Sequence, residues 1–389
     1  MTTRVLVVGH SAALSGAELF LAGMLEHSRV EATVLLLEDG PLADRLRDAG
    51  ADVKVRALPE ELAGVTADGG GLRRGVRGFP RVVRDVATVM RDVRPEVVYT
   101  NSAKAHVLAV PVARALRRPS VLHAHVRADR DSFNAVNLRL VNIASGLATH
   151  VIANSEATRA TLPLWVRDRS TVVYCPTEVR DVAPVPRSGR RLSIACVGRI
   201  AEWKGQCLAV EALHALVAAR GSGAADLHLY GGVAFEKDRA YERELLELVG
   251  RLGLQDLVRV HGHVADVHTT MRSHDVVVHT STKPEPFGQV VVEAMAAGVP
   301  VVAADSGGPV EIVEDGVTGL LYRTGDAAAL GCALDRLVEE PALGTTLATN
   351  ALVAVQRFSY ETIVPEWERV LRSVADQPAR SVVRRRRDG

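Results

Sequence analysis

Short runs rich in valine and leucine alternate with longer amphipathic segments along almost the whole chain. Apolar runs of this kind are typical of parallel strands buried on both faces, and the segments between them are typical of crossover helices. The alternation therefore predicts an α/β fold. The predicted strands are residues 5–8, 33–37, 53–56, 96–99, 121–126, 150–153, 171–174, 192–197, 226–230, 258–261, 275–279 and 299–303.

The alternation is interrupted once, at residues 181–191, which are rich in proline, arginine and glycine and read as a linker. A chain of 389 residues is also too long for one ordinary core. We predict two Rossmann-like doubly wound domains, 1–180 and 192–357, whose sheets face a central cleft. The helix expected at about 360–376 should pack back on the first domain, and residues 377–389 should form a disordered basic tail.

Composition is that of a soluble enzyme, with 47% hydrophobic and 24% charged residues. Lys plus Arg (47) nearly balances Asp plus Glu (46), which gives no case for nucleic-acid binding. No apolar run reaches the roughly 18 residues that span a bilayer. The N-terminus reads directly as a strand, so we expect a cytoplasmic protein. The four cysteines lack CxxC spacing, which disfavours a zinc or disulfide framework.

Arginines cluster between residues 67 and 94, after three consecutive glycines. They are Arg73, Arg74, Arg77, Arg81, Arg84, Arg91 and Arg94. One interpretation is an electrostatic contact with an acidic acceptor or with anionic lipid, at the inner face of a membrane. The other is a mobile loop followed by a solvated helix face. The four arginines of 384–387 are a solvated run or a site for an anionic partner.

Two glutamates eight residues apart, Glu285 and Glu293, stand in the most informative stretch, EPFGQVVVEAMAAGVPVVA. It predicts a loop, a helix over about 288–297 and a buried strand. Glu285 then lies before a helix N-terminus and Glu293 about a turn and a half into the helix. Backbone N–H groups near Gly288 and Gln289 suit a diphosphate, ribose hydroxyls suit a buried Glu293, and Glu285 is placed to hold sugar hydroxyls.

This stretch resembles the E-x7-E motif of the family-4 retaining glycosyltransferases, which have the two-Rossmann-domain GT-B architecture. The resemblance covers nearly the whole chain and continues at 305–311, which is similar to the family's Gly-Gly-x-x-Glu segment. It implies that Glu293 grips the ribose and Glu285 the transferred sugar, while the amides between them bind the distal phosphate. The donor-binding residues implied there are Phe287, Gly288, Gln289 and Val290.

Two cations, Arg199 and Lys204, flank the loop that leaves the first strand of the second domain. A leaving nucleoside diphosphate gains negative charge as the glycosidic bond breaks, and two fixed cations can stabilise it. Spacing alone also allows two surface bases on a turn. The similarity to the family's Gly-Arg-x-x-x-x-Lys-Gly pattern implies the leaving-group role. No DxD pair suits a divalent ion, so we expect neither a metal nor another cofactor.

The first domain has a small-residue turn at Ser15-Gly16, where glycine permits close backbone approach to a donor phosphate. The family carries Gly-Gly-x-Glu here, so Ser15 is a departure. His123 and His125 lie on one face of a strand, and His125 is nearer its C-terminal end. His125 resembles the family histidine beside the donor sugar and is a candidate catalytic residue, with a structural histidine as the alternative. For His123 the structural interpretation comes first.

Polar residues also end the neighbouring strands. Asn101 and Ser102 are candidates for the acceptor pocket, and Asn154-Ser155 reads as a strand end followed by a helix N-cap. His263 lies in a turn that, in the family, holds the nucleobase by main-chain hydrogen bonds. Side-chain identity barely reveals the base in such a turn, and we expect UDP rather than GDP.

These residues, together with what the family resemblance implies, predict a metal-independent, retaining hexosyltransferase. Its donor would be a nucleoside-diphosphate sugar and its acceptor an unidentified hydroxyl, in polysaccharide, glycolipid or secondary-metabolite biosynthesis. One alternative is a nucleotide-sugar epimerase or hydrolase on the same fold, which should show carboxylate and histidine acid–base groups instead of the paired glutamates. The other is a catalytically silent, nucleotide-sugar-binding partner of another transferase.

Overall fold

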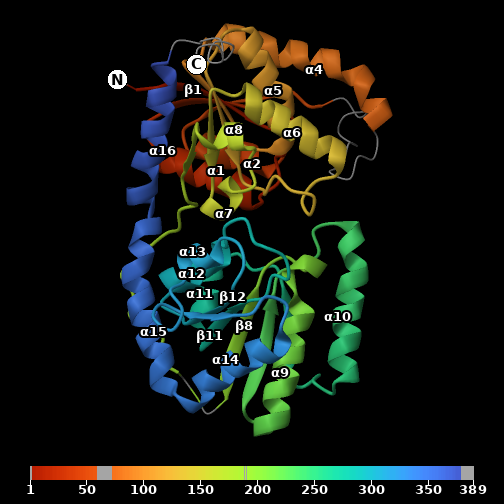
Figure 1. Cartoon of the computed structure of the whole chain (residues 1–389), viewed down its shortest axis with the longest axis vertical. Coiled ribbons are helices and arrows are strands. Elements are labelled where there is room, and N and C mark those ends of the chain that lie inside the picture. Colours follow the sequence, from red (N-terminus) through yellow and green to blue (C-terminus); the bar gives the residue numbers. More distant parts are fainter. Residues whose placement is uncertain (1, 59–71, 188, 190, 378–389) are drawn as a thin grey trace, which may run out of the picture. The chain divides into compact units, whose positions relative to one another are not determined.

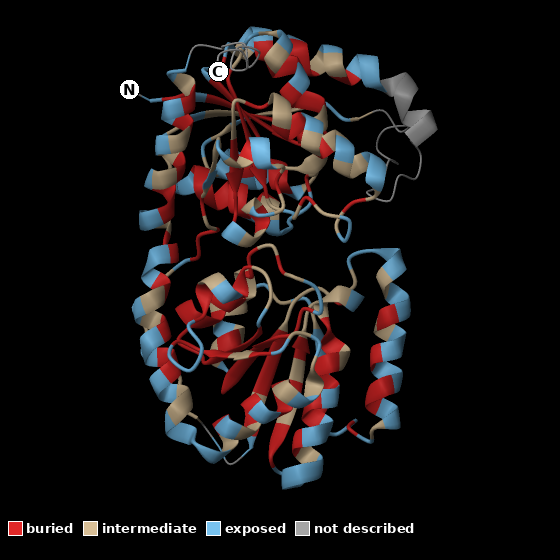
Figure 2. Ribbon diagram, in the orientation of Figure 1, coloured by how far each residue is buried: buried red, intermediate tan, exposed pale blue. Residues whose placement is uncertain are grey.

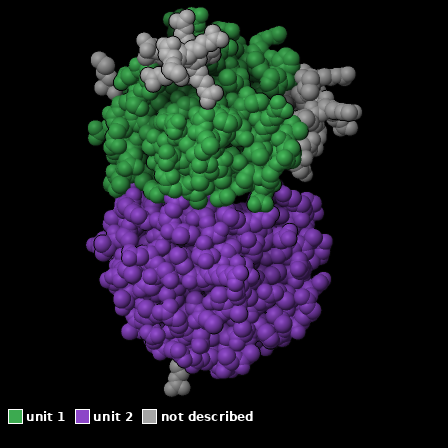
Figure 3. All heavy atoms as spheres, in the orientation of Figure 1, with its two compact units in different colours: residues 1–176, 360–389 green, residues 177–359 purple. Residues whose placement is uncertain are grey.

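The computed structural model describes residues 2–58, 72–187, 189 and 191–377, with only the backbone of 72–78. The chain forms two compact units, which Figure 3 colours separately. Unit 1 is Met1–Pro176 with Tyr360–Gly389, and unit 2 is Thr177–Ser359. Each unit contains one all-parallel sheet with helices packed against it (Figure 1). The predicted fold class is confirmed.

The sheet of unit 1 has seven strands in the order β3-β2-β1-β4-β5-β6-β7. Both of its faces are covered: Val98 of β4 packs in the cluster that contains α4 and α5, whereas its neighbour Tyr99 contacts Trp367 of α16. The strands are β1 (Arg4–Gly9), β2 (Glu31–Leu36), β3 (Asp52–Val55), β4 (Val97–Thr100), β5 (Ser120–Ala124), β6 (His150–Ala153) and β7 (Ser170–Val172). The helices are α1 (Gly16–His27), α2 (Pro41–Asp48), α4 (Leu72–Val93), α5 (Ala103–Ala115), α6 (Ala135–Leu147), α7 (Glu156–Arg159), α8 (Leu164–Arg167) and α16 (Tyr360–Ala375).

The sheet of unit 2 has six strands in the order β10-β9-β8-β11-β12-β13. The strands are β8 (Leu192–Val197), β9 (Ala225–Tyr230), β10 (Val258–Gly262), β11 (Val276–His279), β12 (Val301–Ala304) and β13 (Leu320–Tyr322). The helices are η1 (Glu202–Lys204), α9 (Gln206–Arg220), η2 (Glu236–Asp238), α10 (Arg239–Arg251), α11 (Val267–Arg272), α12 (Gln289–Ala296), α13 (Pro309–Ile312), α14 (Ala327–Glu339), α15 (Pro341–Ala354) and η3 (Val355–Phe358). In Figure 2 the central strands of each sheet are mostly buried, whereas the edge strands β3, β7 and β10 are mostly intermediate or exposed.

Strand order reverses once in each sheet, between β1 and β4 in unit 1 and between β8 and β11 in unit 2. Ligands of open parallel sheets bind outside the carboxyl ends of the strands at such a switch point. The register pairs Val8 with Thr100 and Cys196 with Val278, so the two strands at each switch point end at the same level. The loops after these four strands are therefore the places to look for a site.

The last helix, α16, belongs to unit 1 although it follows all of unit 2 in the sequence. Tyr360 at its start stacks on His27 of α1 at 4.1 Å between ring centroids. Gly23 makes this possible, because a Cβ there would lie 2.2 Å from the Tyr360 hydroxyl oxygen. Trp367, fully buried, packs on Tyr99 at 5.5 Å. Unit 1 is thus assembled from both ends of the chain.

All predicted strands are present, with ends that differ by at most two residues. One strand was missed: β13, three residues long, follows Gly319 and pairs with β12 through Leu320 and Val302. A run this short carries no readable periodicity. The strand predicted over 121–126 was too long, since β5 ends at Ala124 and His125 lies in the following loop.

The predicted linker, residues 181–191, has no helix or strand in its described part. It is nevertheless hydrogen-bonded to other segments of unit 2. The Val185 amide donates to the Gly298 carbonyl at 2.8 Å, and the Arg187 guanidinium donates to the Leu337 and Val338 carbonyls, each at 3.2 Å. Within the described ranges, no helix has both the length and the apolar character needed to cross a bilayer.

The two arginine-rich segments lie only partly within the described residues. Residues 67–71, the side chains of Arg73, Arg74 and Arg77, and residues 378–389 lie outside the described residues. Arg81, Arg84 and Arg91 are exposed on α4, whose opposite face buries Val86 and Met90.

Candidate active site

The loop after β8 carries Lys204 to the switch point of unit 2. Gly205 adopts φ +67°, and a Cβ there would lie 2.1 Å from the Thr280 carbonyl oxygen, so the backbone approaches too closely for a side chain. The Thr280 hydroxyl donates to the Lys204 carbonyl at 2.8 Å. The loop after β8 is thereby fastened to the loop after β11.

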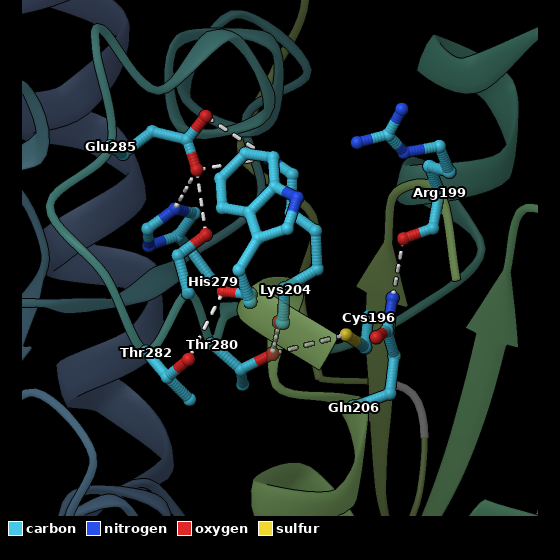
Figure 4. A network of polar contacts seen from close by, with 10 residues as sticks. Cys196, Arg199, Lys204, Gln206, His279, Thr280, Thr282 and Glu285 are labelled. Atoms are coloured by element: carbon cyan, nitrogen blue, oxygen red, sulfur yellow. Dashed lines mark hydrogen bonds and ion pairs between the residues drawn. The ribbon is translucent and has the colours of Figure 1, made fainter. Parts of the chain in front are cut away.

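The half-buried Lys204 and the buried Glu285 form an ion pair (Figure 4). The ammonium donates to both carboxylate oxygens, at 3.0 and 2.9 Å. The Ser281 hydroxyl donates to Oε2 at 2.6 Å, and Nε2 of His279 lies 3.3 Å from the same oxygen. Two residues that the sequence predicted separately therefore form one constellation, although they are 81 positions apart in the chain.

The ionisation of Glu285 follows from these partners. Burial alone would raise the pKa of Glu285, but the Lys204 charge and the hydrogen bonds from His279 and Ser281 outweigh it and hold the pKa well below its usual range. Glu285 is thus a fixed carboxylate at neutral pH. It can accept hydrogen bonds from hydroxyls, and it cannot act as an acid.

Two glycines set the path of the Glu285 loop. Glu285 and Gly307 form a parallel bridge, and the Gly308 amide donates to the Glu285 carbonyl at 2.9 Å. A Cβ on Gly307 would lie 2.2 Å from that carbonyl oxygen, and one on Gly308 would lie 2.0 Å from the Phe287 carbonyl oxygen. The two glycines of segment 305–311 are therefore needed because the backbone of this segment packs directly against the backbone of residues 285–287, with no room for a Cβ.

The helix α12 begins where the sequence predicted, with Gly288 as N-cap at φ +108°. The amides of Gln289 and Val290 lie in the first turn of α12, where the helix itself supplies no carbonyl four residues earlier to accept their hydrogen bonds. Glu293 is half-buried in the second turn. Burial raises the pKa of Glu293 to about 7, although a hydrogen bond from Gln289 and the Lys204 charge act in the opposite direction. Glu293 thus changes charge near neutral pH.

The other predicted donor-binding residues differ in what they can offer. Phe287 is buried with its ring 5.8 Å from that of Phe358, so its side chain packs in the interior. Val290 is half-buried, and His263 is exposed just after β10.

Arg199 lies in the same loop as Lys204 but apart from the ion pair (Figure 4). Its carbonyl accepts a hydrogen bond from the buried Gln206 at 2.9 Å, and its guanidinium lies 4.8 Å from the ring centroid of Phe235. No carboxylate in the described part of the chain pairs with this guanidinium. Arg199 is therefore an available cation, whereas Lys204 already has an anionic partner.

The switch point of unit 1 is built from neutral hydrogen bonds. His10, after β1, shares a hydrogen bond of 2.7 Å with Ser102, after β4. Asn101 donates to the Ala17 carbonyl at 2.7 Å, and its Oδ1 lies 2.8 Å from Nε2 of His125. Three predicted residues of this unit, Asn101, Ser102 and His125, therefore lie close together.

Its histidines are uncharged at neutral pH. Burial lowers the pKa of His125 to about 3 and, with the nearby Lys104, that of His10 to about 4. The ring of His125 stacks on that of His123 at 4.0 Å, and His123 shares a hydrogen bond of 2.5 Å with the Tyr99 hydroxyl. His123, fully buried, has the structural place that the sequence predicted for it.

A hydrogen bond between two of its own side chains stabilises the turn before α1. Ser15 donates to the carboxylate of Glu18, and burial raises the pKa of Glu18 despite that bond. Gly16 has open space where a Cβ would stand, so no contact within unit 1 requires glycine there. The N-cap predicted at Ser155 is confirmed: its hydroxyl accepts from the Thr158 amide at 2.9 Å.

Four site residues were missed from the sequence, namely His10, His279, Ser281 and Gln206. His279 and Ser281 stand at the carboxyl end of β11, where the strand-end rule that selected Asn101 and Ser102 would have found them. Gln206 starts α9 and does not end a strand, so the same rule would not have found it. Among the described residues, no group of three or more His, Cys, Asp or Glu side chains is arranged to hold a metal ion.

Comparison with known proteins agrees with this geometry. The model "Glycosyltransferase Family 4" matches residues 21–180, and the model "Glycosyl transferases group 1" matches 181–352. The crystal structure of HepE from Anabaena in complex with UDP is 30% identical, covers 95% of this chain and 100% of its own, and has a TM-score of 0.80. The chain belongs to glycosyltransferase family 4.

Curated relatives in the family match shorter stretches. Phosphatidyl-myo-inositol mannosyltransferase from Mycobacterium leprae is 37% identical over 35% of this chain and 37% of its own. D-inositol 3-phosphate glycosyltransferase from Actinosynnema mirum is 34% identical over 55% of each. The chain thus spans about half or less of the length of these two relatives. Sucrose-phosphate synthase from Thermosynechococcus elongatus, 21% identical with a TM-score of 0.75, shows the GT-B fold alone.

Proposed function

We propose that this chain transfers a hexose from a nucleoside-diphosphate sugar to a hydroxyl acceptor, with retention at the anomeric carbon and without a metal. The observation that carries the proposal is the Lys204–Glu285 pair beside the start of α12, with Glu293 one turn further on. A carboxylate held ionised and a helix N-terminus suit a sugar and a phosphate respectively.

We assign the donor to unit 2. Glu285 would accept hydrogen bonds from the sugar hydroxyls and Glu293 from the ribose, while the amides of Gly288, Gln289 and Val290 would bind the distal phosphate. UDP is the proposed nucleotide, supported by the crystal structures of HepE in complex with UDP and with UDP-glucose. His263 would lie beside the base.

In the reaction, the glycosidic bond to the β-phosphate breaks and the phosphate oxygen gains charge. Arg199 and Lys204 would stabilise that charge. The acceptor hydroxyl attacks from the face the phosphate leaves, and its proton passes to the departing phosphate. Such a step needs no protein base, which fits the neutral His125 and Asn101 of unit 1. We assign Asn101 and Ser102 to the acceptor, and Gly16 to donor phosphate contact.

A thermal-shift panel tests the donor assignment. A ligand at 100 times its dissociation constant adds roughly 2.7 kcal/mol to the free energy of unfolding. We expect UDP and UDP-hexoses to raise the melting temperature and GDP, ADP and dTDP to do so less. No shift with any nucleotide would contradict the proposal. Donor hydrolysis by the same protein separates an enzyme from a silent binding partner.

A further inference from the structure

The side chain of Arg199 contacts an aromatic ring rather than a carboxylate. Its guanidinium carbon lies 4.8 Å from the ring centroid of Phe235. Within the described part of the chain, this guanidinium forms no hydrogen bond or ion pair. Phe235 therefore provides the contact that restrains a cation assigned above to the leaving group.

Backbone hydrogen bonds hold the loop after β9 beside the loop after β8. The Gly198 amide donates to the Tyr230 carbonyl at 2.8 Å, and the Ile200 amide donates to the Gly232 carbonyl at 3.0 Å. Arg199 lies between the two donors. Its backbone is therefore bonded to the neighbouring loop on both sides.

A glycine allows the two loops to approach each other. Gly231 has φ +128°, and a Cβ there would lie 2.0 Å from the Gly198 carbonyl oxygen, so a side chain would separate the loops. Phe235 follows as the N-cap of η2, where its carbonyl accepts from the Asp238 amide at 2.9 Å. Both ends of this short segment are anchored, and the Phe235 ring reaches the guanidinium from a fixed backbone.

Lys204 provides a comparison within the same unit. Its ammonium lies 4.2 Å from the ring centroid of Trp203, and it also donates to both oxygens of the Glu285 carboxylate. Hydrogen bonds to a charged group are stronger than an exposed cation–π contact, so the Trp203 ring adds to a position that is already fixed. Arg199 has no second partner of this kind among the described residues.

We propose that Phe235 is a positioning residue, whose ring holds the Arg199 guanidinium ready to receive the charge of the leaving phosphate. The inference rests on the leaving-group role proposed for Arg199. The negative face of a ring attracts a cation, and a planar guanidinium stacks on it. A cation fixed before the reaction stabilises developing charge without a cost of reorientation. The ring also leaves the guanidinium N–H groups available, whereas a carboxylate would occupy two of them.

Two other interpretations of the Phe235 ring are apolar packing and a direct contact with the donor. Phe235 is 53% exposed, so apolar burial contributes little at this position. The ammonium of Lys237 lies 5.9 Å from the same ring centroid, at the outer limit of about 6 Å for a cation–π contact. Arg199 is the nearer cation.

The first test replaces the ring and follows hydrolysis of the UDP-hexose that raises the melting temperature most. Phe235→Leu keeps an apolar side chain and should lower kcat by about two- to fivefold, the value of an exposed cation–π contact, with little change in the donor KM. Phe235→Tyr keeps the ring face and should retain the wild-type kcat. Leu246→Ala on α10, at the same 53% exposure, is the matched control and should leave kcat unchanged. Melting curves establish that each variant is folded.

Fluorination separates the charge of the ring face from its shape. Phenylalanine analogues with one, two and three ring fluorines at position 235 withdraw electrons from the ring face and change its size little. We expect kcat to fall stepwise through this series. Equal kcat in all three analogues would show that Phe235 acts by packing and would overturn the proposal.

A double-mutant cycle shows whether the ring acts through Arg199. In the Arg199→Ala background, Phe235→Leu should have no further effect on kcat. The same loss in that background as in the wild type would show that Phe235 acts on the donor or on the fold, and it would overturn the proposal. Lys237→Met should leave kcat unchanged. A loss equal to that of Phe235→Leu would assign the ring to Lys237 instead.

Failure of this inference can be distinguished from failure of the proposed function. If Arg199→Ala lowers kcat and Phe235→Leu does not, only the inference fails; if Arg199→Ala has no effect, the leaving-group role fails with it. NMR of the free protein tests the contact without turnover. The Arg199 Nε–H signal, identified by its absence in Arg199→Lys, should move downfield in Phe235→Leu because the ring current is removed. An unchanged signal would overturn the proposal.

Discussion

The sites at the carboxyl ends of the two sheets occupy the same topological position, at the switch point of strand order. They differ in charge: the side chains of one are ionised and the histidines of the other are neutral. In unit 2, burial of Glu285 is compensated by Lys204, so the carboxylate stays ionised. In unit 1, His10 and His125 hydrogen-bond to the neutral Ser102 and Asn101, and burial keeps both rings uncharged. Desolvation therefore leaves Glu285 ionised, because a lysine ammonium contacts it, and leaves His10 and His125 neutral, because their hydrogen-bond partners are uncharged and the Glu38 charge does not outweigh burial of His10.

The difference suggests a division of labour. A site with fixed charges suits a diphosphate, whose charge increases during bond cleavage, whereas a neutral polar site suits hydroxyl groups. The predictions that follow test this division, and they run from the largest expected effect to the smallest.

Removing Lys204 should have the largest effect. Lys204→Met should lower kcat by about 10²–10³-fold, because the leaving group loses a fixed cation. It should also lower the free energy of unfolding by about 3 kcal/mol, because Glu285 is left buried and unpaired. Steady-state kinetics and denaturant unfolding measure the two effects.

The double variant Lys204→Met with Glu285→Gln tests the cause of the stability loss. It removes the unpaired charge, so stability should return, whereas turnover should stay low because Lys204 and the sugar-binding Glu285 are both replaced. Recovery of both together would mean that Lys204 acts only by holding the fold.

Removing Arg199 should affect catalysis without the stability loss, since its guanidinium has no carboxylate partner in the described chain. Arg199→Ala should lower kcat by about 10²-fold more than it raises the donor KM. The free energy of unfolding should change by no more than about 0.5 kcal/mol. Arg243→Ala on α10 is the matched control. A rise in KM alone would make Arg199 a binding residue and pass the leaving-group role to Lys204 and the α12 amides.

Substitution of Glu293 should mainly weaken donor binding. Glu293→Gln should cost about 1.5–3 kcal/mol in affinity for the nucleoside diphosphate, because charged hydrogen bonds to the ribose are lost. Calorimetry gives this directly. Affinity equal to that of the wild type would contradict the ribose assignment.

The pH dependence of the same residue follows from its raised pKa. Ribose hydroxyls bind the ionised carboxylate, so donor affinity should be full above pH about 7 and weaken as the pH falls through that value. The stability contribution has the opposite sign: it is present below the ordinary pKa of a glutamate and is lost as the pH rises through about 7. The nucleotide also titrates in this range, so the difference between wild type and Glu293→Gln isolates the residue.

The neutral site of unit 1 should give smaller effects. His125→Gln should lower kcat by up to about tenfold while leaving the shape of the pH profile between about pH 5 and 8 unchanged, because the pKa of His125 is about 3. Loss of a limb of the profile in this variant would show that His125 exchanges a proton in the reaction. Its lowered pKa stabilises the fold above the ordinary histidine pKa, and that stability is lost as the pH falls toward 3.

Metal removal should have the smallest effect. With excess chelator, turnover should be unchanged, because Arg199 and Lys204 are proposed to neutralise the diphosphate. Loss of turnover that magnesium or manganese restores would contradict this and would place a metal among the charges of unit 2.

Local patterns were enough for much of this protein. The Val/Leu runs specify every strand but β13, because buried parallel strands need continuous apolar sequence. Gly288 and the apolar run after it specify α12, so the positions of Glu285 before that helix and Glu293 within it could be read directly. The short β13 lay beyond this reasoning, since only its pairing with β12 defines it.

The sequence could not determine which of the loops at the carboxyl ends of the strands lie next to each other. Strand order places β8 beside β11, which allows Lys204 to lie within 2.9 Å of Glu285 and to hold that carboxylate ionised. Strand order likewise places β1 beside β4, and so joins His10 to Ser102. Each residue's type and local element follow from neighbours in the chain, but its charge state depends on distance and burial, which exist only once the sheet is assembled.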